Sequence, residues 1–464
     1  MTRRMLLAAG LAVALSACTS LAPEFERPPL PVAEVFPDTG PAAPATPATA
    51  ITWQNFFAAD PALVSLIEQA LQNNRDLRIA VLNIELARAQ WQVQRSNQVP
   101  GLNASAIGTR QTNASGGITD AYLIGLSMPS FELDFFGRVA NLSDAALAQY
   151  LATEEARKTA QIALVAAVAN AVLALRADEE AIDLTRRTLA SREDSLRLTR
   201  ARYENGVASA LDVAQAESLI ESARVAHAAL RRLKAQDENL LVLLVGRPIA
   251  LPLSDGRSLA GDVTMPDVPA GLPSELLASR PDIRAAEQQL RAANANIGAA
   301  RAAFFPRITL TASAGAASGD LLGLFKSGTL SWAFSPQIVL PIFDGGRNQA
   351  GLDAANTQQA IGIAQYDKAI QTAFREVADA LAGRATLSDQ WRAQSAVAEA
   401  ESVRLKLADL RYENGVASYL DVLDAQRSLF QAQLSAVQVR QAQLQNQVTL
   451  YKVLGGGWTD PPSR

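Results

Sequence analysis

The stretch Arg202-Tyr-Glu-Asn-Gly-Val-Ala-Ser209 occurs twice in this chain, and its second copy, Arg411 to Ser418, is identical. The copies lie 209 residues apart, and a Leu-Asp pair follows each of them at the same spacing, Leu211-Asp212 and Leu420-Asp421. The two halves also match upstream at three places: Asp76-Leu-Arg78 with Asp282-Ile-Arg284, Pro100 with Pro306, and Gly137-Arg138 with Gly346-Arg347. Parallel order of this kind indicates two fused copies of one structural unit.

Each copy predicts a helical hairpin around the repeated stretch. Residues 139–204 contain no Pro or Gly, which predicts a helix on the order of 100 Å long. Seven-residue spacing of apolar residues predicts coiled-coil packing of the long first helix and of the last helix, at Val168, Leu175, Ile182, Leu189, Leu196 and Tyr203 and at Leu423, Phe430, Val437, Leu444 and Tyr451. Gly206 and Gly415 are expected to end the long helices, and Ser209 and Ser418 to cap the returning ones.

The apolar period changes upstream of each long helix. Residues 60–98 and 274–304 have helical periodicity, and two segments with a period of two follow each of them. The clearest alternation is Leu330, Trp332 and Phe334 against small or polar residues, as in a strand with lipid on one side and water on the other. Four strands of a soluble sandwich are the alternative interpretation. If the strands enter lipid, four of them leave open edges that lipid does not tolerate, so several chains must pool their strands.

The N-terminus has the pattern of a targeting segment. Arg3 and Arg4 precede a short apolar run, and Leu15-Ser-Ala-Cys18 resembles the bacterial lipobox. The resemblance implies cleavage after residue 17 and acylation of Cys18, against the alternative of an ordinary signal peptide. Thr19 in place of Asp favours the outer membrane. The Pro- and Ala-rich stretch that follows predicts an extended tether.

Composition excludes several classes of function. The 464-residue chain has one Cys, one His (His227) and a net charge of −4, which excludes disulfide frameworks, thiolate or multi-histidine metal sites and a basic nucleic-acid surface. His227 is expected to be an ordinary residue on a helix face. The chain also lacks a Gly-x-Ser-x-Gly elbow and a phosphate-binding Gly-Lys-Ser/Thr loop. We therefore expect no enzyme, and no cofactor apart from the covalent lipid on Cys18.

The lipobox, the duplicated order of helix, two strands and long helix, and the paired Arg-Tyr-x-x-Gly-x-x-Ser tips resemble the outer membrane factor family. The likeness is closer to its lipoprotein (NodT/OprM-type) branch than to TolC, and it covers roughly residues 50–460. It implies an α+β membrane protein that forms a homotrimer. Each chain contributes four strands to a 12-stranded β-barrel, which continues into a long α-helical coiled-coil barrel.

The expected organisation has six parts. They are a lipoprotein signal peptide (1–17); a lipidated tether (18–51); a first repeat (52–246) with strands at about 101–113 and 121–133, a long helix over 139–204 and a return helix over 209–245; an equatorial connector (247–275); a second repeat (276–455) with strands at about 307–316 and 329–341, a long helix over 347–413 and a return helix over 418–454; and a C-terminal tail (456–464).

The resemblance implies a passive exit duct for small molecules, lipid-anchored in the bacterial outer membrane with a long periplasmic extension. Its expected partners are a periplasmic adaptor (membrane fusion) protein, an inner-membrane pump of the RND or ABC type and outer-membrane lipid, with no nucleic acid. A type I protein secretion duct and a non-conducting lipid-anchored coiled-coil scaffold are the alternatives. The sequence does not identify the cargo, the cognate pump or the state of the gate.

The resemblance also places a gate at the second tip. Tyr412, Asp421 and Asp424 match family positions that project into the closed end of the tunnel. Both carboxylates fall on one helical face, and in a trimer they would form stacked rings that favour cations and raise the pKa of some members. Asp421 fits a helix-cap role equally well, as Asp212 does in the first copy.

TolC has an Arg just after the second tip glycine that links neighbouring protomers, whereas this chain has Ala417 at that position. A latch built from Tyr412 and Arg411 with Asp212 is therefore a hypothesis for this chain. The residues expected to contact the adaptor lie in the two tips: Arg202, Tyr203, Gly206, Ser209, Arg411, Gly415 and Ser418. Identity of the tips in two otherwise diverged copies favours a partner that meets both alike.

Overall fold

The computed structural model describes residues 20–37, 50–112, 114–249, 259, 264–269 and 273–458. The signal peptide, Cys18, most of the connector 247–275 and the last six residues of the tail lie outside the described residues. The chain divides into two compact units, and each unit takes segments from both repeats. We call them the strand unit (1–29, 81–156 and 282–369) and the tip unit (30–80, 157–281 and 370–464).

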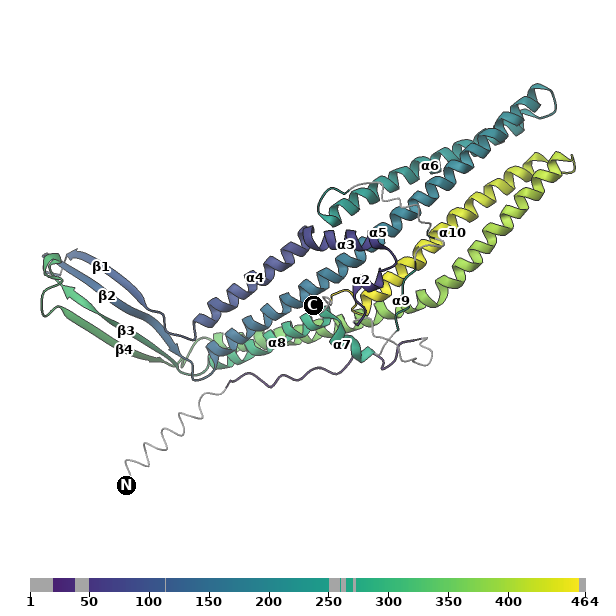
Figure 1. Cartoon of the computed structure of the whole chain (residues 1–464). Helices are drawn as coiled ribbons and strands as arrows, with labels where there is room; N and C mark the ends of the chain where they lie inside the picture. Colours follow the sequence, from purple (N-terminus) through teal and green to yellow (C-terminus); the bar gives the residue numbers. More distant parts are fainter. Residues whose placement is uncertain are drawn as a thin grey trace. The chain divides into compact units, whose positions relative to one another are not determined.

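The strand unit contains one antiparallel sheet in the order β1-β2-β3-β4 (Figure 1). Its strands are β1 (Asn103–Thr112), β2 (Ile118–Leu133), β3 (Arg307–Ser318) and β4 (Leu330–Val339). A register shift between Met128 and Phe131 accommodates Pro129, which has no N–H to donate to the ladder. The four predicted strands therefore form a single sheet in the described chain, and a sandwich would need two.

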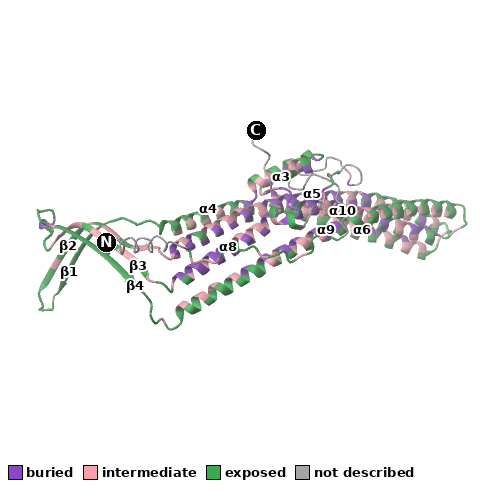
Figure 2. Ribbon diagram, turned by 90° about the horizontal axis from the view of Figure 1, so that it is seen from below, coloured by how far each residue is buried: buried purple, intermediate pink, exposed green. Residues whose placement is uncertain are grey.

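The sheet exposes a large apolar surface. Leu330, Trp332 and Phe334 are all exposed, and β4 is exposed along its whole length (Figure 2). Several large apolar side chains exposed on one strand indicate contact with lipid or with another protein. The free edges, β1 and β4, carry unpaired backbone groups.

The helices of the strand unit pack closely because their facing side chains are small. They are α8 (Pro281–Ala302), part of α4 (Arg75–Ser96), and the first portions of α5 (Arg138–Glu204) and α9 (Arg347–Glu413). Ala145 and Ala148 of α5 form a buried cluster with Ala292 and Ala295 of α8. Alanine at these positions lets the helix backbones approach one another.

The long helix α5 is a packed core helix. Among the described helices it alone is long and apolar enough to pass a test for membrane spans, with a window of mean hydropathy 1.7. That window is 72% buried inside the protein, as in the core helix of a packed bundle. The heptad residues Val168 and Leu175 are among the buried ones.

The described start of the tether is attached to the strand unit rather than free. Asn294 donates to the carbonyl of Pro23 at 2.8 Å, and Ser20 donates to Asn141 at 2.7 Å. Arg27 forms an ion pair with Glu287 at 2.9 Å. Composition predicted an extended tether, and the described residues 20–37 contain no helix or strand. The contacts to the strand unit are an addition that composition did not predict. The segment binds the helices through a backbone carbonyl, the Ser20 hydroxyl and the Arg27 guanidinium.

The tip unit contains two helical hairpins and the N-terminal helices. The hairpins pair the remainder of α5 with α6 (Ala210–Val245), and that of α9 with α10 (Tyr419–Val453). The smaller helices are α2 (Trp53–Phe56), α3 (Pro61–Asn73), α7 (Leu276–Ser279) and the turn η2 (Pro273–Glu275). Phe56 stacks on Tyr451 at 4.1 Å between ring centroids, and the Tyr451 hydroxyl donates to the carbonyl of Ile51 at 2.6 Å. The heptad residues Leu423, Phe430, Leu444 and Tyr451 of α10 are buried.

Helical periodicity over 60–98 predicted one helix, but the structure has two, α3 and α4, separated at Asn74. Asn74 has an extended backbone, and its side chain accepts from Leu77 N at 2.9 Å and donates to Leu244 O at 2.9 Å. The second repeat breaks at the matching place, between α7 and α8, where Pro281 begins α8. The break at Asn74 depends on a bond to α6, which periodicity does not reveal.

Candidate functional site at the hairpin tips

Both hairpins turn in the same way at the repeated stretch. Gly206 and Gly415 have φ of 72° and 70°, a left-handed conformation that ends each long helix without the penalty of a side chain. Val207 N donates to Arg202 O at 2.8 Å, and Val416 N donates to Arg411 O at 2.9 Å. The two tips therefore have the same backbone turn.

The caps of the two returning helices differ. Ser209 and Asp212 form a reciprocal capping box, in which Ser209 N donates to Asp212 Oδ2 at 2.9 Å and Asp212 N donates to Ser209 Oγ at 3.2 Å. Ser418 makes no side-chain capping bond, and Asp421 is exposed. Of the two equivalent carboxylates, the structure thus uses Asp212 as a cap and leaves Asp421 outside a capping box.

Asp424 is bound by two arginines of its own hairpin. Arg404 of α9 donates to it at 2.5 Å, and Arg427, one turn further along α10, also forms an ion pair with it. The hydrogen bond from Arg404 and the positive charges hold the pKa of Asp424 below its ordinary value, so it is ionised at neutral pH. Within one chain this shift is opposite to the like-charge effect expected of a carboxylate ring.

Tyr412 lies where the two hairpins meet. Its ring is 5.1 Å from that of Tyr419, and the guanidinium of Arg202 lies 4.7 Å above it. Below this contact, an apolar cluster joins the hairpins and includes Ala216, Tyr419, Val422 and Leu423. Arg202 and Tyr412, both predicted from the sequence as site residues, are thus brought together in a cation–π contact.

Within the described chain no ion pair links Arg411 to Asp212, and a latch between neighbouring chains stays a hypothesis. Asp212 bonds to Ser209, and Arg411 is exposed. Tyr203 is also exposed, so it can contact a partner.

The sequence interpretation missed the apolar residues that the tips expose. Val207 and Val416 occupy equivalent positions and are 77% and 68% exposed. Leu211 and Leu420, four residues further on, are exposed as well. All four belong to the repeated stretch and its Leu-Asp extension, so the repeat itself was the signal that could have found them.

One described residue of the connector, Leu259, is bound by polar side chains of the tip unit. Leu259 is buried, its N–H donates to Glu180 of α5 at 3.2 Å, and its carbonyl accepts from Arg440 of α10 at 2.8 Å. Arg440 in turn lies 4.7 Å over the Trp391 ring of α9. One connector residue therefore contacts both hairpins.

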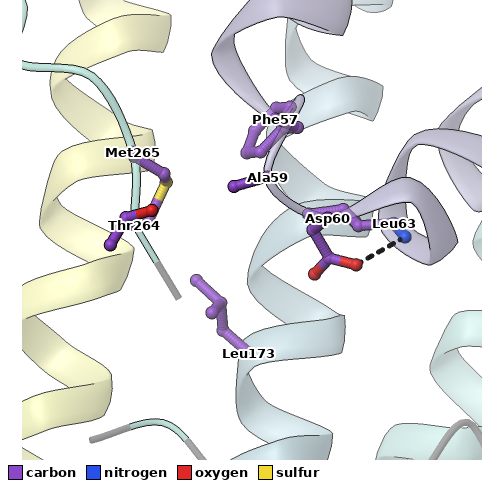
Figure 3. A pocket seen from close by; sticks show the side chains of 7 residues that line it. All are labelled: Phe57, Ala59, Asp60, Leu63, Leu173, Thr264 and Met265. Atoms are coloured by element: carbon purple, nitrogen blue, oxygen red, sulfur yellow. Dashed lines mark hydrogen bonds between the residues drawn. The ribbon is translucent and has the colours of Figure 1, made fainter. Parts of the chain in front are cut away.

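A small, mainly apolar pocket lies where the N-terminal helices meet the connector (Figure 3). It is lined by Phe57, Ala59, Asp60, Leu63, Leu173, Thr264 and Met265. Both carboxylate oxygens of Asp60 are engaged, one by Leu63 N at 3.1 Å and the other by Arg176 at 2.5 Å. This carboxylate is therefore a structural group. Over the described residues, no cluster of three or more His, Cys, Asp or Glu could hold a metal ion.

Comparison with known proteins places the chain. The family model "Outer membrane efflux protein" matches residues 66–247 and 272–456. The chain belongs to the outer membrane efflux protein family. It is 47% identical to the probable efflux pump outer membrane protein TtgC of Pseudomonas putida, over 99% of this chain and 96% of TtgC. It is 46% identical to the outer membrane protein OprJ of Pseudomonas aeruginosa, over 97% and 95% of the two chains.

Solved structures agree with this assignment. The open-state outer membrane channel MtrE of Neisseria gonorrhoeae matches with a TM-score of 0.87 and 43% identity, over 95% of this chain and 99% of MtrE. A membrane protein of Pseudomonas aeruginosa matches with a TM-score of 0.87 and 45% identity, over 95% and 98%. The resemblance seen in the sequence is thus confirmed, and this efflux protein is an outer-membrane efflux duct with the TolC-like fold. The family is one of channels rather than of enzymes.

Proposed function

We propose that this efflux protein is a homotrimeric exit duct in which three chains close a 12-stranded barrel above an α-helical tunnel. The observation that supports the proposal best is the four-stranded sheet, with its exposed apolar residues and its two free edges. Lipid requires every backbone polar group to be paired, and three such sheets can achieve this only by joining edge to edge in a ring. Acylation of Cys18 would anchor each chain to the outer membrane.

The duct is passive and works with a periplasmic adaptor and an inner-membrane pump of the RND or ABC type. Relatives are named as outer membrane proteins of antibiotic, toluene and solvent efflux pumps, which supports small and partly apolar molecules as cargo. The exposed pairs Val207/Leu211 and Val416/Leu420 support adaptor contact at both tips, because apolar side chains exposed at the end of a hairpin favour a protein partner.

The tip carboxylates form the gate. Three copies of Asp421 and Asp424 would surround the narrowest part of the tunnel. The ion pairs with Arg404 and Arg427 make Asp424 a neutralised position, so Asp421 supplies most of the uncompensated negative charge. Tyr412, held between Arg202 and Tyr419, sets the distance between the hairpins, and Asp212 stabilises the first tip as a cap.

Single-channel recording in planar bilayers tests the gate, with ion selectivity read from reversal potentials across a salt gradient. The wild type is expected to give small, cation-selective openings. Asp421→Asn should lose cation selectivity, whereas Asp424→Asn should shift it towards anions because two guanidiniums lose their carboxylate. Asp421→Ala/Asp424→Ala should give larger openings.

Asp194→Asn is the matched control, because Asp194 is an exposed carboxylate on α5 that forms an ion pair with Arg197 of the same helix. If conductance and selectivity are unchanged in all tip variants, the protein is still a duct, but the carboxylates only stabilise their helices. Folded protein that never conducts would favour the lipid-anchored scaffold. Passage of an unfolded polypeptide through the pore in preference to small molecules would favour type I secretion.

A further inference from the structure

The strand unit contains an aromatic contact at the base of the sheet that joins the two repeats. Phe136, in the turn between β2 and α5, stacks on Phe305, in the turn between α8 and β3, at 4.6 Å between centroids and 23° between planes. The neighbouring Glu132 forms ion pairs with Arg138 at 2.6 Å and with Arg307 at 2.7 Å. The outgoing turn of the first repeat thus packs against the incoming turn of the second.

The duplication generates the same two turns once more, but within the described chain they lie apart. Pro100 matches Pro306, so Val99 is the counterpart of Phe305, and Val99 is 63% exposed. The outgoing turn of the second repeat, between β4 and α9, carries Ile342 and Phe343, which are 94% and 93% exposed. One turn adjoins the β1 edge of the sheet and the other follows the β4 edge.

Strand direction determines how these turns can meet. Each strand is antiparallel to its neighbour, so β1 and β4 run in opposite directions. The β4 edge of one copy can therefore continue the antiparallel ladder on the β1 edge of another, in a head-to-tail contact that closes into a ring. This pairing brings the β4–α9 turn beside the α4–β1 turn of the next copy.

We propose that Ile342 and Phe343 of one chain pack against Val99 and Leu102 of a second copy, so that the turns that Phe136 and Phe305 join within each chain are joined between chains by neighbouring residues. Gly345 stands at the position of Phe136, and Phe343, two residues earlier, supplies the aromatic ring. Leu102 is 68% exposed, and it extends the apolar surface of the turn. Gly101 stands where the second repeat has Arg307, so the contact between chains lacks an equivalent of the Arg307–Glu132 ion pair. The contact is therefore apolar. The inference rests on the proposed ring of chains and specifies one part of its interface.

Cysteine cross-linking of the full-length protein in its membrane tests the contact. Cys18 is the only native cysteine, so wild-type protein gives the background. The variant Val99→Cys/Phe343→Cys should give covalent dimers and trimers upon mild oxidation, whereas each single variant should give neither. The matched control Phe136→Cys/Phe305→Cys should lose its free thiols without forming covalent oligomers. Leu102→Cys/Ile342→Cys serves as a second pair if the first variant does not fold.

The outcomes separate this inference from the proposed trimer. If light scattering shows an oligomer but both engineered thiols stay free and react with maleimide, the proposed contact is wrong and the oligomer is retained. Quenching of a Phe343→Trp variant by brominated lipid would assign the turn to the membrane and would also overturn the contact. Monomeric folded protein would overturn both proposals.

Discussion

Asp60 is the residue whose replacement should destabilise the tip unit most directly. One of its oxygens caps α3 by accepting Leu63 N at 3.1 Å, and the other accepts from Arg176 of α5 at 2.5 Å. Both charged side chains are buried. Asp60→Ala therefore removes a helix cap and a buried opposite charge in a single step, whereas Asp60→Asn keeps the capping oxygen and removes the charge.

The two contributions have different sizes. Loss of an N-cap costs about 1 kcal/mol. Removing one partner of a buried ion pair costs about 3–5 kcal/mol. We expect Asp60→Ala to lower the free energy of unfolding by about 4–6 kcal/mol. Asp60→Asn keeps the cap and should lower it by about 3–5 kcal/mol. Asp60→Asn/Arg176→Met should recover most of the loss, because neutral groups often replace a buried ion pair without cost.

Thermal unfolding in detergent, followed by helix circular dichroism, measures these differences, and with Arg176→Met as the second single variant the set forms a double-mutant cycle. For a chain of this length each kcal/mol should move the Tm by about 1–2 °C. Asp194→Asn breaks an exposed ion pair and should change stability by less than about 1 kcal/mol. A double variant as unstable as Asp60→Ala, or Asp60→Asn as stable as wild type, would refute the conclusion that the buried ion pair stabilises the unit more than the helix cap does.

Three further predictions use the same unfolding measurement. Gly246 has φ of 77°, and an added Cβ would lie 2.4 Å from the carbonyl oxygen of Asn73, so Gly246→Ala should cost more than the roughly 1–2 kcal/mol of the left-handed backbone alone. Gly206→Ala, with φ of 72° and open space around it, should cost only that amount. Burial, reinforced by neighbouring carboxylates, raises the pKa of Asp178 from 3.8 to about 6. Stability should therefore fall as pH rises from about 4 to about 6, and Asp178→Asn should remove this slope and stabilise by about 1–2 kcal/mol at pH 7 after solvent screening. Tyr451→Phe should lose about 1 kcal/mol with its hydrogen bond to the N-terminal segment, while its ring can still stack.

The sequence predicted the long elements well because their signals are local. The helix expected over 139–204 corresponds to α5, Arg138–Glu204, and the one over 347–413 corresponds to α9. In α5 an uninterrupted run of helix formers indicates the helix, and a left-handed Gly just beyond the last turn ends both α5 and α9. Helix α9 continues through Gly351, Gly362 and Gly383, so only its end is indicated as clearly. Strand ends were less accurate, as the segment expected over 121–133 begins at Ile118.

What the sequence missed depends on contacts between distant segments. The break at Asn74 needs the carbonyl of Leu244, and the attachment of the tether needs Asn294 and Glu287. The partner of Asp424 was within reach of sequence reasoning. Arg404 lies as far before Asn414, at the second tip, as Asp424 lies after it, so the two face each other across the hairpin.

The tips provide a physical reason to separate local turn chemistry from partner contact. If identity of the two stretches reflected only the turn, the same residues would make the same caps, yet Ser209 caps α6 while Ser418 makes no side-chain cap on α10. Conformation explains the glycines, but it does not explain two exposed Val and two exposed Leu at matching positions, because they would be replaced by polar residues without cost to the turn. A partner that contacts both hairpins through the same type of surface explains why the exposed Val and Leu residues match in the two tips. Val207→Asn and Val416→Asn remove the apolar surface without changing the charge at the tip. Each should therefore weaken binding of a purified adaptor by a similar factor while leaving conductance unchanged, and a loss confined to one tip would show that the hairpins meet different partners.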